Sequence, residues 1–92
     1  MDNEDAVQVW LVERTYSDDE QNLIILTYAT PDGSQYFRKE RALTSSADVR
    51  ETTAAVDADP ANLGRVDEPA LREQYATEAR RMAAEHEPDD AI

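Results

Sequence analysis

Cysteine is absent from this 92-residue chain, glycine occurs only twice and lysine only once. Without cysteine the chain forms neither disulfides nor thiolate metal sites, as is typical of cytoplasmic proteins. The two glycines, Gly33 and Gly64, are too few for a glycine-rich loop that cradles phosphate. No apolar run approaches the roughly 20 residues of a membrane helix, and the acidic residues 1–6 lack the basic start of a signal peptide. We therefore expect a cytoplasmic protein without a membrane-spanning segment.

Acidic side chains are in large excess, with 21 Asp+Glu against 9 Lys+Arg and a formal net charge of −12. Such a charge repels itself in dilute buffer, whereas at roughly molar salt the Debye length falls to about 3 Å and screens the repulsion. All the basic residues except Lys39 are arginines, which bind carboxylates bidentately. This composition indicates adaptation to a salt-rich cytoplasm and salt-dependent folding. The alternatives are an acidic partner-binding module, a nucleic-acid mimic and a disordered acidic segment.

Three runs rich in β-branched and aromatic residues predict strands at about residues 7–16, 23–29 and 35–43. These ordered patterns argue against disorder. Pro31-Asp32-Gly33, between the second and third runs, is a turn signature. Because the connections are short, we expect an antiparallel three-stranded meander. The first two runs are apolar on both faces, which predicts burial from both sides.

The apolar period changes after Thr44. Ser45 and Asp48 resemble a capping box, with Asp in place of Glu, and they precede a helix predicted over about residues 46–57. Four β-branched residues follow at helical spacing, although the adjacent threonines weaken the pattern: Val49, Thr52, Thr53 and Val56.

A second helix is predicted over about residues 68–86. We expect Asp67 to cap it, with Pro69 in its first turn. Before it, Asp59 is expected to cap a single turn at residues 60–63. The apolar stripe of the second helix is Leu71, Tyr75, Ala79 and Met82. Two i,i+4 ion pairs are expected on its surface, Glu68–Arg72 and Arg81–Glu85.

The predicted architecture is a single α+β domain at residues 7–87, between a flexible acidic lead at 1–6 and a tail at 88–92. It consists of a small antiparallel three-stranded β-meander followed by two helices. The helices cover one face of the sheet, and too little chain remains to cover the other. The uncovered face predicts a homodimer.

Residues that carry chemistry do not gather in a recognisable pattern. His86 is the only histidine and has no converging ligands in the sequence. The acidic cluster Asp18-Asp19-Glu20 lacks the spacing of a calcium loop, and with 21 acidic residues such clusters arise by chance. We therefore predict no catalytic residue, no metal site and no cofactor.

One basic segment stands out against the acidic background. Arg38, Lys39 and Arg41 lie on the third predicted strand, within residues 35–50, whose net charge is +2. A basic strand with aromatic neighbours binds anions or single-stranded nucleic acid. The simpler interpretation is an edge strand protected by charge. High salt weakens nucleic-acid binding, so we do not expect nucleic acid as the main partner.

Two stretches carry a resemblance to known proteins. The run Val9–Gly33, and the run Asn62–Asp67 that leads into Leu71–Tyr75, resemble the small conserved hypothetical proteins of halophilic archaea. The resemblance implies a salt-rich cytoplasm. It implies no activity, cofactor or site residue.

The favoured function is a non-enzymatic cytoplasmic protein that acts by self-association or by binding another macromolecule. Its expected binding residues are Trp10, Tyr28, Arg38, Lys39 and Arg41. Two other classes stay open: an anion- or nucleic-acid-binding regulator that uses the third strand, and a small cation-dependent enzyme that uses Asp18, Asp19 and Glu20 or His86.

Overall fold

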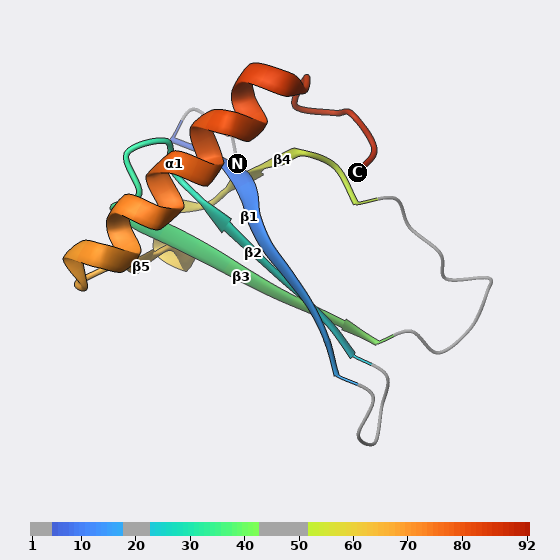
Figure 1. Ribbon diagram of the computed structural model, residues 1–92. Helices are drawn as coiled ribbons and strands as arrows, with labels where there is room; N and C mark the ends of the chain where they lie inside the picture. The colour runs from blue at the N-terminus through green and yellow to red at the C-terminus, as the bar shows by residue number, and fades with distance from the viewer. Residues whose placement is uncertain (1–4, 18–22, 43–51) are drawn as a thin grey trace.

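A computed structural model describes residues 5–17, 23–42 and 52–92. In these residues an antiparallel five-stranded sheet has the order β4-β1-β2-β3-β5, and one α-helix crosses a face of it (Figure 1). The elements are β1 (Val7–Ser17), β2 (Leu23–Ala29), β3 (Gln35–Ala42), β4 (Ala55–Ala58), the 3₁₀ turn η2 (Pro60–Asn62), β5 (Gly64–Arg65) and α1 (Pro69–Glu85).

The α+β class is confirmed, but the expected three-stranded meander followed by two helices is wrong. Of the helix expected at 46–57, residues 46–51 lie outside the described residues, and Ala55–Ala58 forms strand β4. This strand pairs antiparallel with the first four residues of β1. The β-branched residues Thr52 and Thr53 disfavour a helix, and pairing with β1 favours an extended backbone in the residues that follow them.

The register of the strands divides the sheet into two faces. Trp10, Ala29 and Tyr36 are neighbours across β1, β2 and β3. Their face, the helix face, is covered by Tyr75, Ala79 and Met82 of α1, which pack in the same two core clusters. On the opposite face, the rear face, the corresponding neighbours are Leu11, Tyr28 and Phe37.

The rear face is covered by residues 52–54 and by the C-terminal tail, residues 86–92. Arg14 and Arg41 extend from the rear face and donate hydrogen bonds to the main-chain oxygen of Ile92 (3.2 Å) and to Oγ1 of Thr52 (3.0 Å). Three main-chain hydrogen bonds join the tail to this segment: Ala55 N–H to Pro88 O (3.0 Å), Ala54 N–H to Asp90 O (2.9 Å) and Ile92 N–H to Thr52 O (2.8 Å). Part of each face of the sheet is thus covered by this chain itself, whereas Tyr16 and Lys39 on the rear face are exposed.

The predicted helix caps have different outcomes. Asp59 caps η2 as expected, because its Oδ1 accepts a hydrogen bond from the Ala61 N–H at 2.9 Å. Asp67 does not cap α1: the N-cap position belongs to Glu68, whose side chain makes no capping bond. Asp67 instead lies 3.8 Å from Nε of Arg65.

The Pro31-Asp32-Gly33 turn is confirmed, and it connects the β2–β3 hairpin to the helix. Gly33 has a φ of +74°, in the left-handed region that favours glycine. A Cβ here would collide with the carbonyl oxygen of Arg72 and lie 2.9 Å from the amide nitrogen of Ala76. The turn therefore packs directly on the backbone of α1 and holds the helix beside β3.

Candidate functional site

Trp10 and Tyr28, which the sequence suggests as binding residues, lie in the core on opposite faces of the sheet. Trp10 is 6% exposed and packs in the cluster that includes Ala79 and Met82 of α1. Tyr28 is 2% exposed on the rear face, with its ring centroid 6.1 Å from that of Phe37. Burial raises the pKa of Tyr28, and the charges of Arg41 and Arg14 oppose this rise. In the folded chain these rings are part of the core, and the homodimer expected from the sequence stays a prediction.

The three basic residues of β3 separate between the two faces. Arg38 lies on the helix face, opposite Thr27, and is exposed. Lys39 and Arg41 lie on the rear face, where Lys39 is exposed and Arg41 is half-buried against Thr52. Basic side chains therefore flank the outer edge of β3 on both faces of the sheet.

Among the residues that the structure describes, only part of this outer edge is paired. In the described parts of the chain β5 is the only strand beyond β3, and it pairs with Gln35 and Tyr36. Thr30 donates its N–H to the Gln35 carbonyl (3.1 Å), so the main-chain N–H and C=O groups of Gln35 face β2. Because peptide groups alternate between the two sides of an antiparallel strand, the N–H and C=O groups of Arg38 and Glu40 point outward, past the end of β5.

Tyr36 and Gly64 fix the geometry at the end of β5. They are cross-strand partners, and a Cβ on Gly64 would collide with the Tyr36 ring. The ring thus lies over the glycine, an arrangement that covers the exposed backbone of an edge glycine. This contact fixes the position of the Tyr36 ring on the helix face, where the ring forms a wall beside β5.

A pocket of about 260 Å³ lies beside this wall, between the β3–β5 edge and the first turns of α1. Two tyrosines, two arginines, two carboxylates and two aliphatic residues line it: Tyr36, Tyr75, Arg38, Arg65, Asp67, Glu68, Val66 and Leu71. Leu71, expected in the buried stripe of the helix, is 37% exposed. Ala76, which the expected stripe omits, is buried together with Tyr75, Ala79 and Met82.

The charged side chains of the pocket differ in whether they have an ion-pair partner. Arg65 and Asp67 lie 3.8 Å apart, both well exposed. Arg38 and Glu68 make no ion pair within residues 5–17, 23–42 and 52–92. The expected pair Glu68–Arg72 is not formed, because Arg72 donates two hydrogen bonds to the carbonyl of Val66 (3.3 and 3.0 Å).

Tyr75 connects the pocket to the sheet below it. Burial raises the pKa of Tyr75 and the charge of Glu13 adds to the rise, while Arg38 opposes it. Glu13 and Arg38 flank Thr27 on neighbouring strands of the helix face. The Tyr75 hydroxyl therefore lies in the field of an acidic and a basic side chain.

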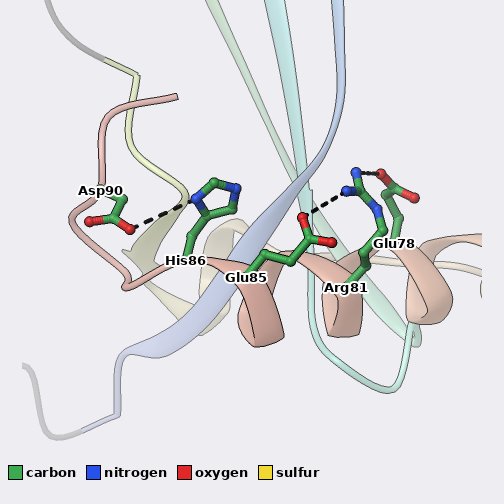
Figure 2. Close-up of polar contacts among 5 residues, drawn as sticks. All are labelled: Glu78, Arg81, Glu85, His86 and Asp90. Atoms are coloured by element: carbon green, nitrogen blue, oxygen red, sulfur yellow. Dashed lines mark hydrogen bonds and ion pairs between the residues drawn. The ribbon is translucent and has the colours of Figure 1, made fainter.

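His86 and its surroundings do not form a metal centre in the described residues. Figure 2 shows His86 facing Asp90 of the tail, with 3.8 Å between Nδ1 and Oδ2. In the same view Arg81 pairs with Glu78 and with Glu85, the latter at 3.1 Å as expected. No group of three potential ligands gathers among residues 5–17, 23–42 and 52–92. Asp18, Asp19 and Glu20 lie outside them.

Sequence reasoning found Arg38 but missed the pocket around it. The sequence pattern places Tyr75 and Leu71 in the buried stripe of the helix, and it pairs Glu68 with Arg72. The two-residue strand β5, which brings Arg65 beside β3, has no pattern of its own. The usable signal was the pairing of Gly64 with an aromatic residue, and this requires the register of the sheet.

Comparison with known proteins identifies a matching family. The family of unknown function DUF7967 matches residues 3–92. No curated protein and no solved structure matches the chain. Among the described residues, no helix has the length and hydrophobicity needed to cross a membrane.

Proposed function

The chain belongs to DUF7967, a family of unknown function, and we propose that it is a non-enzymatic binding protein. Its outer β3 edge captures an extended acidic segment of another protein by strand addition. The observation that carries the proposal is the outward peptide groups of Arg38 and Glu40, set among three basic side chains in a chain of net charge −12. We place this activity in a salt-rich cytoplasm, in keeping with the acidic composition.

The main chain supplies the affinity in this proposal. An added strand lies in line with β5 and bonds to the N–H and C=O groups of Arg38 and Glu40. Such main-chain bonds are the basis of peptide capture at sheet edges. They persist in molar salt, where a Debye length of about 3 Å leaves only charges in direct contact effective.

The side chains supply the preference for acidic partners. Lys39 and Arg41 lie on the rear face, and Arg38 on the helix face. An acidic strand therefore meets a cation on either side of the sheet, in direct contact where salt does not screen the attraction. A lone basic segment then fixes where a partner strand binds.

The aromatic residues of β3 favour a protein strand over single-stranded nucleic acid. Nucleic-acid binding of this kind needs exposed rings on which bases stack. Phe37 packs on Tyr28 in the core, and Tyr36 covers Gly64. Phe37 therefore offers no free ring, and the free side of the Tyr36 ring faces a pocket of about 260 Å³ that has room for one side-chain-sized group rather than a row of stacked bases.

A second copy of this chain is the alternative occupant of the same edge. Antiparallel pairing of two β3 strands about Lys39 sets Arg38 opposite Glu40 of the second copy, twice by symmetry. The two Arg38–Glu40 pairs favour such an edge homodimer, whereas the two Lys39 side chains that face each other on the symmetry axis oppose it.

Glu40→Pro tests the proposal, because it removes an outward N–H that the described sheet does not use. Edge strands tolerate proline at such positions, so the circular dichroism and melting temperature should stay near those of the wild type. Anisotropy of a labelled peptide that alternates glutamate and valine should show binding to the wild type and none to Glu40→Pro.

Two controls make this test specific. Glu40→Ala removes the side chain, keeps the N–H and should bind the acidic peptide at least as well as the wild type. A peptide that alternates lysine and valine should not bind. Equal binding of both peptides, or full binding by Glu40→Pro, would contradict the proposal. A mass that doubles with concentration and returns to the monomer in Glu40→Pro would assign the edge to a second copy.

A further inference from the structure

The pocket between α1 and the β3–β5 edge is separate from the main-chain edge, and we infer that it binds a free amino acid with an aromatic or large apolar side chain. This inference does not depend on strand addition at β3. The side chain lies between the tyrosine rings, the carboxylate binds Arg38 and the ammonium group binds Glu68.

The size and walls of the pocket set the class of ligand. Its volume of about 260 Å³ lies just below the roughly 300–1,000 Å³ of sites for drug-sized molecules. The rings of Tyr36 and Tyr75, with Leu71 and Val66, make an apolar lining. Aromatic walls favour an aromatic or large apolar group of the size of one side chain.

The charge of the lining sets the polar end of the ligand. Two arginines and two carboxylates line the pocket, so its formal charge is zero. A purely anionic ligand meets two carboxylates as well as two cations, in a molecule of net charge −12. A zwitterion presents one charge of each sign and so matches both.

Arg38 and Glu68 are the charged groups free to act on the ligand. Arg65 and Asp67 face each other at 3.8 Å, while Arg38 and Glu68 are without ion pairs in the described ranges. They enter the pocket from different walls, Arg38 from β3 and Glu68 from the residue before α1. A guanidinium binds a carboxylate in a planar, two-point contact, and a carboxylate accepts from an ammonium group.

Calorimetric titration of the full chain with L-phenylalanine is the direct test. Three analogues each lack one recognised feature: N-acetyl-phenylalanine lacks the ammonium group, phenylalanine amide lacks the carboxylate and glycine lacks the ring. We expect saturable binding of L-phenylalanine and at least about tenfold weaker binding of each analogue, since each leaves a charged or apolar contact unmade. No binding of L-phenylalanine or L-leucine, or equal binding of the N-acetyl compound, overturns the inference.

Matched variants locate the site. Arg38→Gln should weaken L-phenylalanine binding at least about tenfold, and Glu68→Gln should do the same while leaving the affinity for N-acetyl-phenylalanine unchanged. Arg80→Gln makes the same charge change as Arg38→Gln, but on the exposed side of α1 and outside the pocket. This variant should bind L-phenylalanine as the wild type does. Loss of binding in Arg80→Gln equal to that in Arg38→Gln would contradict a specific site.

The outcome is separable from that of the proposed strand addition. Glu40→Pro should abolish capture of the acidic peptide and leave L-phenylalanine binding intact. Glu68→Gln should have the opposite pattern.

Discussion

At the scale of single residues, Asp32 shows how one exposed carboxylate organises the β2–β3 turn. Its Oδ1 accepts hydrogen bonds from the Thr30 hydroxyl (2.6 Å), the Ser34 N–H (3.0 Å) and the Ser34 hydroxyl (2.8 Å). These bonds favour the ionised form and lower the pKa of Asp32 from 3.8 to about 2. The same turn places Gly33 against the backbone of α1, so its integrity bears on the position of the helix.

The lowered pKa predicts a defined pH dependence. The carboxylate stabilises the fold fully above its unfolded pKa near 3.8, and this contribution is lost as the pH falls toward about 2. Because Asp32 is exposed and screened by water, we expect only about 1 kcal/mol. Urea unfolding of the wild type and of Asp32→Asn should therefore converge by about this amount between pH 5 and pH 2. A constant difference between the two proteins over this range would show that the charge of Asp32 does not stabilise the turn.

At the scale of elements, the C-terminal tail pairs with the segment that leads into β4. It bonds to residues 52–55 through three main-chain hydrogen bonds, and Ile92 packs against the core cluster. Ala54, at the centre of this contact, is fully buried.

Deletion of residues 88–92 should lower the free energy of unfolding by about 2–4 kcal/mol. The loss combines three hydrogen bonds at about 1 kcal/mol each with the exposure of Ala54 and the apolar surface around it. Guanidinium unfolding followed by tryptophan fluorescence measures it through Trp10. Asp90→Ala is the matched control, because it keeps the main-chain bonds and loses only side-chain contacts to Glu87 and His86. An equal loss in the control would mean that the tail acts through Asp90 alone.

The elements also show what the sequence can and cannot predict. Long apolar runs underlie β1 and β2, and the helical period with Pro69 underlies α1, because each pattern repeats several times within its own segment. The four residues of β4 and the two of β5 are too short to contain a repeating pattern. They form strands because they pair with β1 and β3, which are distant from them in the sequence. The same limit applies to the candidate sites. Arg38 is visible as a local charge anomaly, whereas the pocket also needs Glu68 and Tyr75, which lie about 30 or more residues later in the chain.

At the scale of the whole molecule, charge is the dominant feature. The net charge of −12 is spread over a chain of 10.4 kDa, and the ion pairs formed by α1 are exposed. Exposed pairs of this kind contribute only about 0–1 kcal/mol each, so they do not offset the repulsion among the remaining acidic groups.

The repulsion predicts a strong dependence of stability on salt. We expect the melting temperature to rise steadily from dilute buffer to about 2 M KCl, where screening is nearly complete. Circular dichroism and light-scattering mass should be followed together. The triple variant Asp57→Asn, Glu73→Gln, Asp89→Asn neutralises three exposed acids and should show a flatter dependence. A melting temperature independent of KCl would remove the salt-adaptation hypothesis and leave basic partners as the reason for the acidity.

The pairing of the tail with residues 52–55 also bears on how the protein is made. A ribosome releases residues 88–92 after all five strands and the helix, so the nascent β1–β2–β3 meander is synthesised long before the segment that covers its rear face. Contacts between distant parts of a chain also form slowly. The rings and aliphatic side chains of that face are therefore exposed to solvent until the tail has been synthesised. Until the tail is made, the net negative charge of the nascent chain is what keeps this apolar face soluble.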